Sequence, residues 1–556
     1  MARSPPPPTG GPHRAEALWV FLALLPLSLL YLWPLPADIT HLTPAEPDAQ
    51  LTLWHPLWLA WLLQAEEAGA LLQLHTGLVS APAGVDLRYF QEWLTAGVTA
   101  TLGALTGSLV AGQTLGFAAA WSLSGAASWI LGRSLGGRWG GALAAAATLS
   151  APFLRGALVT ALPEFLWFGL AVGAAAAPLT LARRGAVKAG LLAGALGALA
   201  GLATRYLALG AAGWLAVIAI GAAAAGRRAQ AGAAALGLAV MSPALLFMGW
   251  PQLTAPPDAK PLFMALPVWP SPSAMFLPTP LYNPTLDPTW ETHTWSIYVG
   301  WILIGAALVG AWRGGWRERT LLAGAAAFLV LAAGWRLPGG AALPLSWLAA
   351  AAPVLENLHA PSRFVMMAQI GLAGAAASAI AGAGRWAPAL VLAVLLEAAW
   401  VTRALLPLPT VAPPEPSPAA ADIDHGVVLE VSLGRDDPRL ATRHDAALQL
   451  RQMRHGRPLI NMPAWPGGGA EDPTPPERTA ALLGWFSSAL PEEAARAPYT
   501  LSAPSGALDG IDWLVVDDPA AERLHVCAVT RSGSVGSPGE TVALSCRVDG
   551  EPSLLR

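Results

Sequence analysis

Charged residues are scarce in this chain of 556 residues, making up 12% of it against 54% hydrophobic residues. The net charge of −3 gives no global field that would attract nucleic acid. Long apolar runs recur instead, and a helix of about 20 apolar residues crosses the ~30 Å hydrocarbon core of a bilayer. The composition therefore places the chain among polytopic membrane proteins.

Several motifs of catalysis and transport are missing from the sequence. It has no Walker A loop, no Gly-x-Gly-x-x-Gly after a strand, no His-Glu-x-x-His and no cysteine cluster for a metal. The segment from Ser502 to Gly506 is not a Gly-x-Ser-x-Gly nucleophile elbow. ATP-driven transport and zinc proteolysis thus have no support. Charged residues do not line up along several spans, which disfavours ion-coupled transport.

Cysteine is nearly absent too, since Cys527 and Cys546 are the only two and both lie near the C-terminus. In an oxidising compartment they can form one disulfide. Two unpaired buried thiols are the alternative, and the spacing leaves both open.

The basic residues that are present alternate along the chain. Thirteen of them lie in the N-terminal segment and in every second short loop between apolar runs: Arg3, Arg14, Arg133, Arg138, Arg183, Arg184, Lys188, Arg227, Arg228, Arg313, Arg317, Arg319 and Arg385. Cytoplasmic loops carry the excess of Lys and Arg. The pattern predicts a cytoplasmic N-terminus, with the acidic loops and the C-terminal part on the outer side.

The apolar runs predict a mainly α-helical bundle with eleven spans, near residues 17–35, 113–132, 139–154, 163–182, 189–205, 206–225, 232–249, 296–312, 319–335, 363–382 and 386–406. Three other segments are predicted not to cross. Residues 94–110 form a re-entrant or surface helix, because a crossing there would invert every later loop. Leu53 to Leu74 forms an interfacial helix with a tryptophan-rich face, and a short apolar helix lies near Leu343 to Ala352.

The predicted domain order follows from these spans. Residues 1–16 are a Pro-rich, disordered cytoplasmic segment, and residues 17–406 form the membrane domain, with outside loops at 36–93 and 250–295. A Pro-rich linker at 407–418 leads to a small extracytoplasmic α/β domain at 419–556. In that domain we expect strands at Val427–Leu433, Leu514–Val516 and Thr541–Val548, and helices at Pro438–His455 and Pro476–Leu490.

Carboxylates just outside the first span are the strongest candidates for chemistry. Glu46 and Asp48, separated by Pro47, could act on a headgroup held at the membrane surface, either as a general base or by binding a divalent cation. The alternative is that acidic residues merely mark the outer side. Glu164 begins the fourth span from outside, and Glu397 lies inside the last span, where a carboxylate is a functional candidate by default.

Arginines on the same side are candidate ligands of a lipid phosphate. Arg155 either binds substrate or pairs with Glu164, and Arg205 lies at an outer turn. Arg363 begins a span from outside, where it could instead extend to the headgroups. His359 lies in the loop before Arg363, and Tyr282 lies in the 250–295 loop.

The order of these segments resembles bacterial multi-pass GT-C-fold glycosyltransferases, which use polyprenyl-phosphate-linked sugars. The resemblance covers about residues 15–400 and rests on Glu46–Trp54, Ser80–Leu87, Ser150–Arg155, Glu164, Tyr298–Trp301 and Ala360–Phe364. It extends more weakly into the tail, at His455–Leu459 and Gly510–Val516. One departure is that Pro47 splits the acidic pair, which is adjacent in better-known members.

The resemblance implies an enzyme in the bacterial cytoplasmic membrane that moves a hexosyl or pentosyl group from a polyprenyl-phosphate donor to a lipid or polysaccharide acceptor. By position, Asp48 matches the catalytic base or metal ligand, with Mg²⁺ or Mn²⁺ as the expected cation. Glu164 matches the second-loop carboxylate, and Arg363 matches a contact to the donor phosphate. Two other classes stay open: a non-catalytic membrane protein that binds an envelope polymer, and a transporter of lipid-linked sugars.

Overall fold

A computed structural model of the chain describes residues 14–45, 75–76, 85–86, 92–159, 162–254, 272–278, 297–335, 342–351, 361–412, 428–432, 499–503, 511–518, 523–532 and 541–549, with a few single positions between them. The chain divides into two compact units. The first comprises residues 1–49, 91–253 and 262–411, and the second comprises residues 50–90, 254–261 and 412–556.

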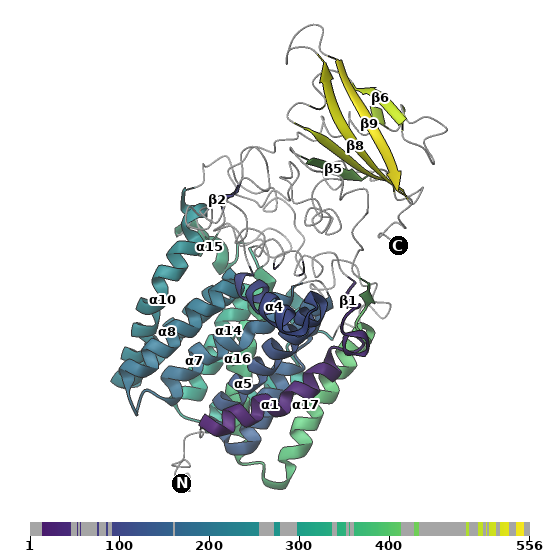
Figure 1. Cartoon of the computed structure of the whole chain (residues 1–556). Coiled ribbons are helices and arrows are strands. Elements are labelled where there is room, and N and C mark those ends of the chain that lie inside the picture. The colour runs from purple at the N-terminus through teal and green to yellow at the C-terminus, as the bar shows by residue number, and fades with distance from the viewer. Residues whose placement is uncertain are drawn as a thin grey trace. The chain divides into compact units, whose positions relative to one another are not determined.

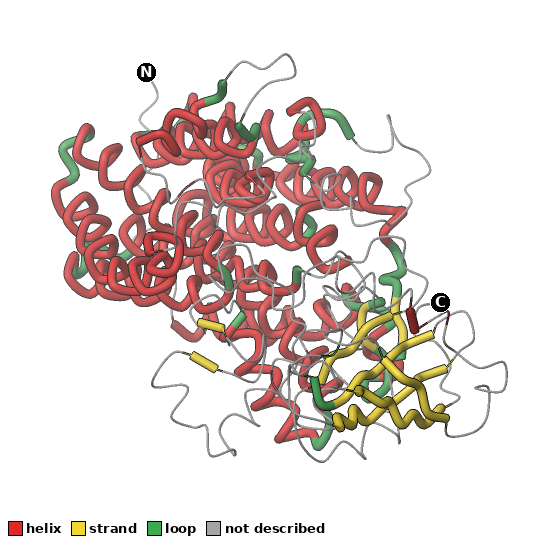
Figure 2. Tube along the Cα trace, turned by 90° about the horizontal axis from the view of Figure 1, so that it is seen from above, coloured by secondary structure: helices red, strands yellow, loops and turns green. Residues whose placement is uncertain are grey.

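The first unit is built from helices, which are red in Figure 2. In chain order they are α1 (Arg14–Tyr31), α4 (Trp93–Thr106), α5 (Leu109–Leu149), α6 (Pro152–Val159), α7 (Gly169–Thr180), α8 (Ala186–Ala203), α9 (Arg205–Ala224), α10 (Arg228–Thr254), α13 (Trp301–Arg313), α14 (Trp316–Ala332), α15 (Pro344–Ala351), α16 (Val365–Ala381) and α17 (Ala387–Thr402). Short 3-10 helices include η3 (Pro163–Phe168), η8 (Pro361–Phe364), η9 (Gly384–Trp386) and η10 (Arg403–Leu405). Helix α16 packs against α5, α13 and α14 in the middle of the bundle (Figure 1).

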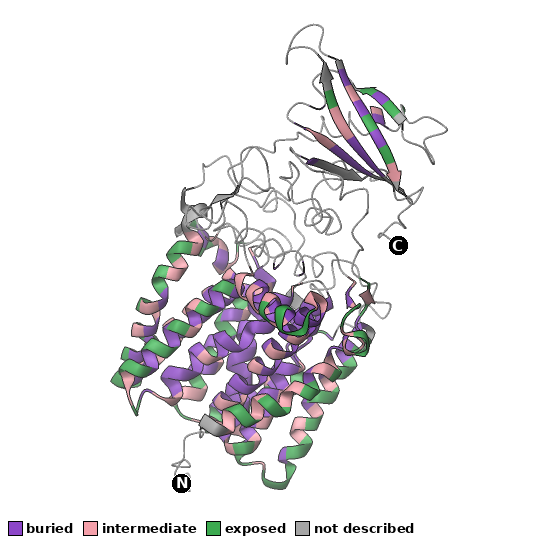
Figure 3. Cartoon of the chain, in the orientation of Figure 1, coloured by how far each residue is buried: buried purple, intermediate pink, exposed green. Residues whose placement is uncertain are grey.

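The bundle is apolar on its outside as well as in its core. Figure 3 shows buried residues along the central helices and exposed ones along α1, α10 and α17. Many of the exposed side chains are large and apolar, among them Trp19, Leu30, Ile220, Leu246, Trp312 and Leu396. An apolar outer surface of this extent is typical of a protein surrounded by lipid.

Helix α5 is a hairpin of two antiparallel arms. Gly136 and Gly137 leave the helical conformation, and Gly137 has a φ of 68°, which favours glycine. The Ser128 hydroxyl donates to Thr148 Oγ1 at 2.8 Å. Twenty residues of straight helix would separate these two groups by about 30 Å, so the chain reverses between them. The arms correspond to the separate spans predicted at 113–132 and 139–154.

A helix or helix arm lies at each of the eleven predicted span positions, which confirms a mainly helical membrane fold. The count of eleven crossings is not confirmed. Among the residues that the structure describes, six helices are long and apolar enough to cross a bilayer, with α5 and α6 taken as one, and α1 and α13 are shorter apolar helices.

Two of the three predicted non-crossing segments fall on described residues. Helix α4 has 14 residues, which span about 21 Å and fall short of the ~30 Å hydrocarbon core. The short apolar helix near Leu343 to Ala352 is α15. Most of the predicted tryptophan-rich helix at Leu53–Leu74 lies outside the described residues.

The turns that carry the basic residues meet at one end of the bundle, here called the basic end. Glu16, at the start of α1, forms an ion pair with Arg133 at the α5 turn. Gly136 in the same turn packs closely on the end of α16. A Cβ added to this glycine would lie 1.7 Å from the Ala377 carbonyl oxygen. The neighbouring Ser378 hydroxyl reaches the Gly310 carbonyl at 3.3 Å, near the end of α13. Helices α1, α13 and α16 and the α5 turn therefore share this end.

The segments that follow the first and last spans pair with each other. Strand β1 (Thr43–Pro44) runs antiparallel to β4 (Thr410–Val411). Beside this ladder, the Ala45 N–H donates to the Pro409 carbonyl at 3.0 Å, and the Leu408 N–H to the Trp33 carbonyl at 3.1 Å. Segments more than 350 positions apart are thereby joined at the end of the bundle opposite the basic end.

The second unit contains a five-stranded sheet of order β5-β7-β8-β9-β6. Its strands are β5 (Val428–Ser432), β6 (Tyr499–Ala503), β7 (Trp513–Asp518), β8 (Arg523–Ser532) and β9 (Thr541–Asp549). Strands β5 and β7 are parallel, and the other pairs are antiparallel. Strands β2 (His75–Thr76) and β3 (Val85–Asp86) form a small separate ladder.

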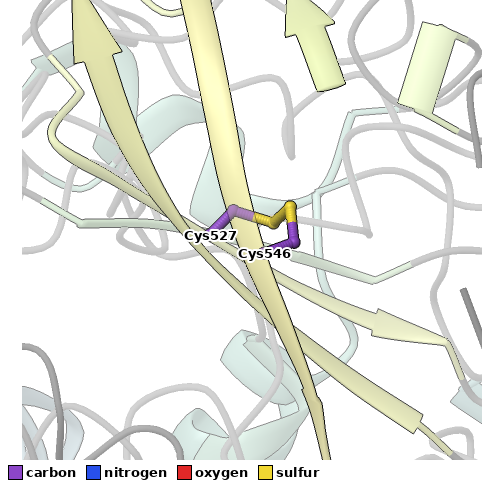
Figure 4. The surroundings of a disulfide bond; sticks show 2 residues. All are labelled: Cys527 and Cys546. Carbon is purple, nitrogen blue, oxygen red and sulfur yellow. A yellow bond between two sulfur atoms is a disulfide. The ribbon is translucent and has the colours of Figure 1, made fainter. Parts of the chain in front are cut away.

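Cys527 and Cys546 lie directly opposite each other in β8 and β9 and form a disulfide (Figure 4). Of the two alternatives that the spacing left open, the structure has the bonded pair.

The three strands predicted in the tail are present as β5, β7 and β9, whereas β6 and β8 were not predicted. The predicted helix at Pro438–His455 lies outside the described residues, and only three positions of the one at Pro476–Leu490 are described as helical.

Candidate active site

Four of the eight predicted site residues fall in the described part of the chain: Arg155, Glu164, Arg205 and Arg363. The other four lie outside the described residues: Glu46, Asp48, Tyr282 and His359. Glu46 directly follows Ala45, which the β1–β4 pairing fixes. In addition, Thr43 Oγ1 donates to Gln113 Oε1 at 2.8 Å, and both side chains are fully buried. The chain therefore enters the Glu46–Asp48 segment from a fixed position.

Glu164, Arg205 and Arg363 each lie at or just before the N-terminus of a helix. Glu164 is in η3 before α7, Arg205 is the first residue of α9, and Arg363 is in η8 before α16. Helix α16 has its far end at the basic end, and α7 and α9 lead there into the turns that carry Arg183 and Arg227. The three N-termini therefore lie at the opposite end of the bundle, where their N–H groups and dipoles favour an anion.

An aromatic cluster brings these three segments together. The ring centroid of Tyr206 lies 6.2 Å from that of Phe165 and 5.9 Å from that of Phe364. Phe165 also meets Phe153 edge-on at 5.5 Å, and Phe364 lies 6.1 Å from Phe328. Each charged residue directly precedes one ring of the cluster, so the packing of these rings brings together the three chain segments that carry the charged residues.

Arg363 is half-buried, and its guanidinium lies against two rings of the cluster. Its guanidinium carbon lies 5.0 Å from the ring centroid of Tyr206 and 5.4 Å from that of Phe165. Its Nε is buried and has no hydrogen-bond partner. Ring faces attract a cation, but they do not replace hydrogen-bond acceptors. The guanidinium is thus held in place with donor capacity left for an anionic ligand.

Glu164 supplies a carboxylate beside the same cluster, with only 4% of its surface exposed. Arg205 is partly exposed at the start of α9. The three segments that meet at the cluster thus carry two arginines, a buried glutamate and three helix N-termini. This combination suits a phosphate-bearing substrate, with the carboxylate available for proton transfer or for holding a hydroxyl.

The aromatic residues of the cluster are the part of this site that sequence reasoning missed. The available signal was the repeated pair of a charged residue and an aromatic one: Glu164-Phe165, Arg205-Tyr206 and Arg363-Phe364. Each pair lies at the outer end of a predicted span. Because the three pairs are far apart in the chain, only the packing shows that their rings touch.

Arg155 has a different environment. The side chain is 1% exposed, and its Nε and Nη2 donate to the Leu405 carbonyl at 3.1 and 2.8 Å. Its Nη1 donates to the Tyr31 carbonyl at 2.6 Å. These bonds tie the end of α1 to η10, which follows α17, and Glu164 is not among the hydrogen-bond partners of Arg155. Its predicted role in substrate binding stays untested.

The intramembrane carboxylate Glu397 also has a structural partner. It accepts hydrogen bonds from the N–H groups of Trp301 and Ile302 at 2.9 and 3.2 Å and from the Tyr298 hydroxyl at 2.7 Å. It therefore caps the start of α13 from the neighbouring helix α17. Gly300 fits beside it because its φ is 91° and a Cβ would lie 3.2 Å from Glu397 Oε2.

We find no group of three His, Cys, Asp or Glu side chains that could hold a metal ion within the described part of the chain. The predicted metal ligand, Asp48, is not in that part.

No protein-family model matches the chain, and no curated protein matches it. Among solved structures, the chain is similar to the cryo-EM structure of the arabinofuranosyltransferase AftD from Mycobacteria, with 16% sequence identity and a TM-score of 0.46. The match covers 96% of this chain and 42% of that one, so this chain spans less than half the length of that protein. A likeness at this level carries no argument about function. The function proposed here therefore rests on Arg363 and its neighbours.

Proposed function

We propose that this chain is an integral membrane glycosyltransferase that moves a sugar from a polyprenyl-phosphate donor to an envelope acceptor at the outer face of the bacterial cytoplasmic membrane. One observation carries the proposal. The half-buried guanidinium of Arg363 has a buried, unbonded Nε and lies against the rings of Phe165 and Tyr206, which directly follow Glu164 and Arg205 in the chain. An apolar outer surface leads to this end of the bundle, as a lipid-borne phosphate requires.

In this proposal Arg363 binds the donor phosphate, and Arg205 and the N-termini of α9 and α16 add positive potential. Asp48 takes the proton of the acceptor hydroxyl, and the hydroxyl oxygen forms a bond to the anomeric carbon as the bond from that carbon to the phosphate oxygen breaks. Polyprenyl phosphate leaves with its charge stabilised by Arg363. Attack from the opposite face inverts the anomeric configuration. Glu164 orients the acceptor.

A divalent cation at Asp48 is the other role predicted for this residue. It would neutralise the phosphate leaving group. Since Asp48 lies outside the described residues, we derive no step through a metal.

Two observations support the outer location. The basic turns meet at the end of the bundle opposite Arg363, and loops rich in basic residues face the cytoplasm. The disulfide between Cys527 and Cys546 fits an oxidising compartment for the sheet-containing unit.

The test uses the full chain, purified in lipid nanodiscs, with a panel of polyprenyl-phosphate sugars, and measures release of the polyprenyl phosphate. We expect release with one sugar class, with Asp48→Asn lowering turnover by about 10²-fold or more. Arg385→Gln, an exposed arginine at the basic end, is the matched control and should keep full activity.

Unchanged turnover in Asp48→Asn would show that Asp48 is not the general base. Donor binding without any release would favour the non-catalytic binder over the transferase. Movement of intact donor across the bilayer of a proteoliposome would favour the transporter.

A further inference from the structure

A second group of arginines lies at the basic end, where two inter-helix turns meet the first turn of a helix. Arg183 is in the turn between α7 and α8, Arg227 is in the turn between α9 and α10, and Arg317 is in the first turn of α14. These residues come from different parts of the chain and have no part in the site around Arg363.

Backbone packing joins the turns of Arg227 and Arg317. The Arg227 N–H donates to the Ala222 carbonyl at 2.7 Å, which folds this residue back over the last turn of α9. At that turn a Cβ on Gly221 would lie 2.3 Å from Thr320 Oγ1, so α14 packs directly on α9 there. Thr320 is one helical turn from Arg317.

The turn of Arg183 lies against the same corner of the bundle. Its neighbour Ala182 packs with Ala189 of α8 and with Ala233, in the second turn of α10. Helix α10 begins at Arg228, directly after Arg227. The three turns thus form one corner. The pKa of Arg317 agrees with this proximity. Burial lowers this pKa most, the charges of Arg183 and Arg227 lower it further, and the charge of Glu318 raises it.

Protein carboxylates do little to neutralise this corner. Glu318 is the one acidic residue among the groups that act on Arg317, and its Oε2 accepts the Gly315 N–H at 2.7 Å as part of the capping of α14. Glu16, the other acidic residue described at the basic end, pairs with Arg133 at the α5 turn. The cluster of Arg183, Arg227 and Arg317 is therefore a place of excess positive charge.

Exposed apolar side chains lie on α8 and α9, near the ends of these helices that form the corner. Val187, in the first turn of α8, and Ile220, near the end of α9, are 63% and 70% exposed. Leu191 continues this exposed apolar surface one turn further along α8. A ligand at this corner thus meets the arginines at one end and the apolar surface of α8 and α9 further along. A phospholipid has the matching order, with a charged headgroup followed by acyl chains.

We propose that Arg183, Arg227 and Arg317 form a binding site for the phosphate headgroup of an anionic phospholipid in the leaflet at the basic end. The guanidinium groups bind the phosphodiester, and the acyl chains lie along α8 and α9. Juxtamembrane cations attract anionic lipid at about 1 kcal/mol each, and the convergence of three turns on one corner makes this a defined site. It does not depend on the function proposed for the other end of the bundle.

The test measures lipid binding to the purified full chain in detergent by native mass spectrometry. Phosphatidylglycerol, phosphatidylcholine and inorganic phosphate are the three probes. We expect bound phosphatidylglycerol in excess of phosphatidylcholine. Arg183→Gln and Arg317→Gln should each weaken phosphatidylglycerol binding about fivefold. Arg183 is exposed, so its variant keeps the test valid if Arg317→Gln folds poorly.

Arg385→Gln is the control, because it removes the same charge from the same end outside the cluster. Binding of phosphatidylglycerol should be unchanged in this variant. If Arg385→Gln lost as much phosphatidylglycerol binding as the cluster variants, the lipid would be held by general charge attraction and not by a defined site. Equal binding of the two lipids, or competition by millimolar inorganic phosphate as strong as by phosphatidylglycerol, would also overturn the proposal.

Discussion

Two arginines lie at the same end of the bundle, and their surroundings differ in one respect that decides their roles. Arg155 is enclosed by backbone carbonyl groups that accept three of its N–H bonds. Arg363 is enclosed by ring faces, and its Nε has no acceptor. Both were candidates for binding a lipid phosphate from sequence alone. The comparison indicates that Arg155 stabilises the fold and that Arg363 is available to a ligand.

The difference has a simple physical origin. A buried charge is costly unless hydrogen bonds compensate it, and the carbonyls of Leu405 and Tyr31 meet that need for Arg155. Ring faces hold a cation by about 0.5–2 kcal/mol and leave its N–H donors free. Arg363 therefore gains more from an added anion than Arg155 does.

The largest expected effect is the loss of stability in Arg155→Met. Methionine keeps the length of the side chain but leaves the carbonyls of Leu405 and Tyr31 buried without a donor. Each such loss costs about 1–3 kcal/mol, so we expect destabilisation of about 3 kcal/mol, measured as unfolding of the purified chain in mixed micelles. Arg363→Met is the matched variant and should lose less than Arg155→Met, about 0.5–2 kcal/mol. Equal losses in the two variants would contradict the comparison.

The next effect concerns binding. Arg363→Lys keeps the charge but loses the planar, bidentate group and its ring contacts. We expect the Kd for a polyprenyl-phosphate sugar to rise about tenfold, with little change in stability, measured by a fluorescence binding assay in nanodiscs. Asp48→Asn, which removes no phosphate contact, should leave the Kd close to that of the wild type. If Arg363→Lys binds the polyprenyl-phosphate sugar with an unchanged Kd, the guanidinium N–H groups of Arg363 do not bind the phosphate.

Sequence patterns predicted the positions of the helices because apolar runs of membrane length are a strong local signal. The reversal inside α5 was also predictable, since Gly136 and Gly137 stand between Arg133 and Arg138. Strand β8 was missed for a physical reason. His525, Val526 and Cys527 are consecutive and all buried, so the alternation that marks a half-buried strand is absent.

The roles of individual charged residues were not predictable in the same way. The carbonyl that accepts from Arg155 is 250 positions away, and no local pattern contains it. Arg363 lacks such a partner only because rings from two other segments surround it. The sequence identified which charged residues lie at the ends of helices. The folded chain was needed to distinguish those that are already satisfied.

Glu397 extends the comparison to an acidic residue and gives the smallest effect. Its carboxylate caps α13 and belongs with Arg155 among the satisfied groups. Glu397→Ala should therefore destabilise the bundle by about 1 kcal/mol, the usual cost of a lost helix cap. Glu397→Gln keeps an acceptor and should lose only a few tenths, the part due to charge at a helix N-terminus. Turnover per folded molecule should stay unchanged in both variants, because α13 starts from the same position. A loss of turnover in Glu397→Gln at normal stability would instead show that this carboxylate takes part in function. Satisfied hydrogen bonds would then no longer distinguish charged residues that stabilise the fold from those that bind substrate.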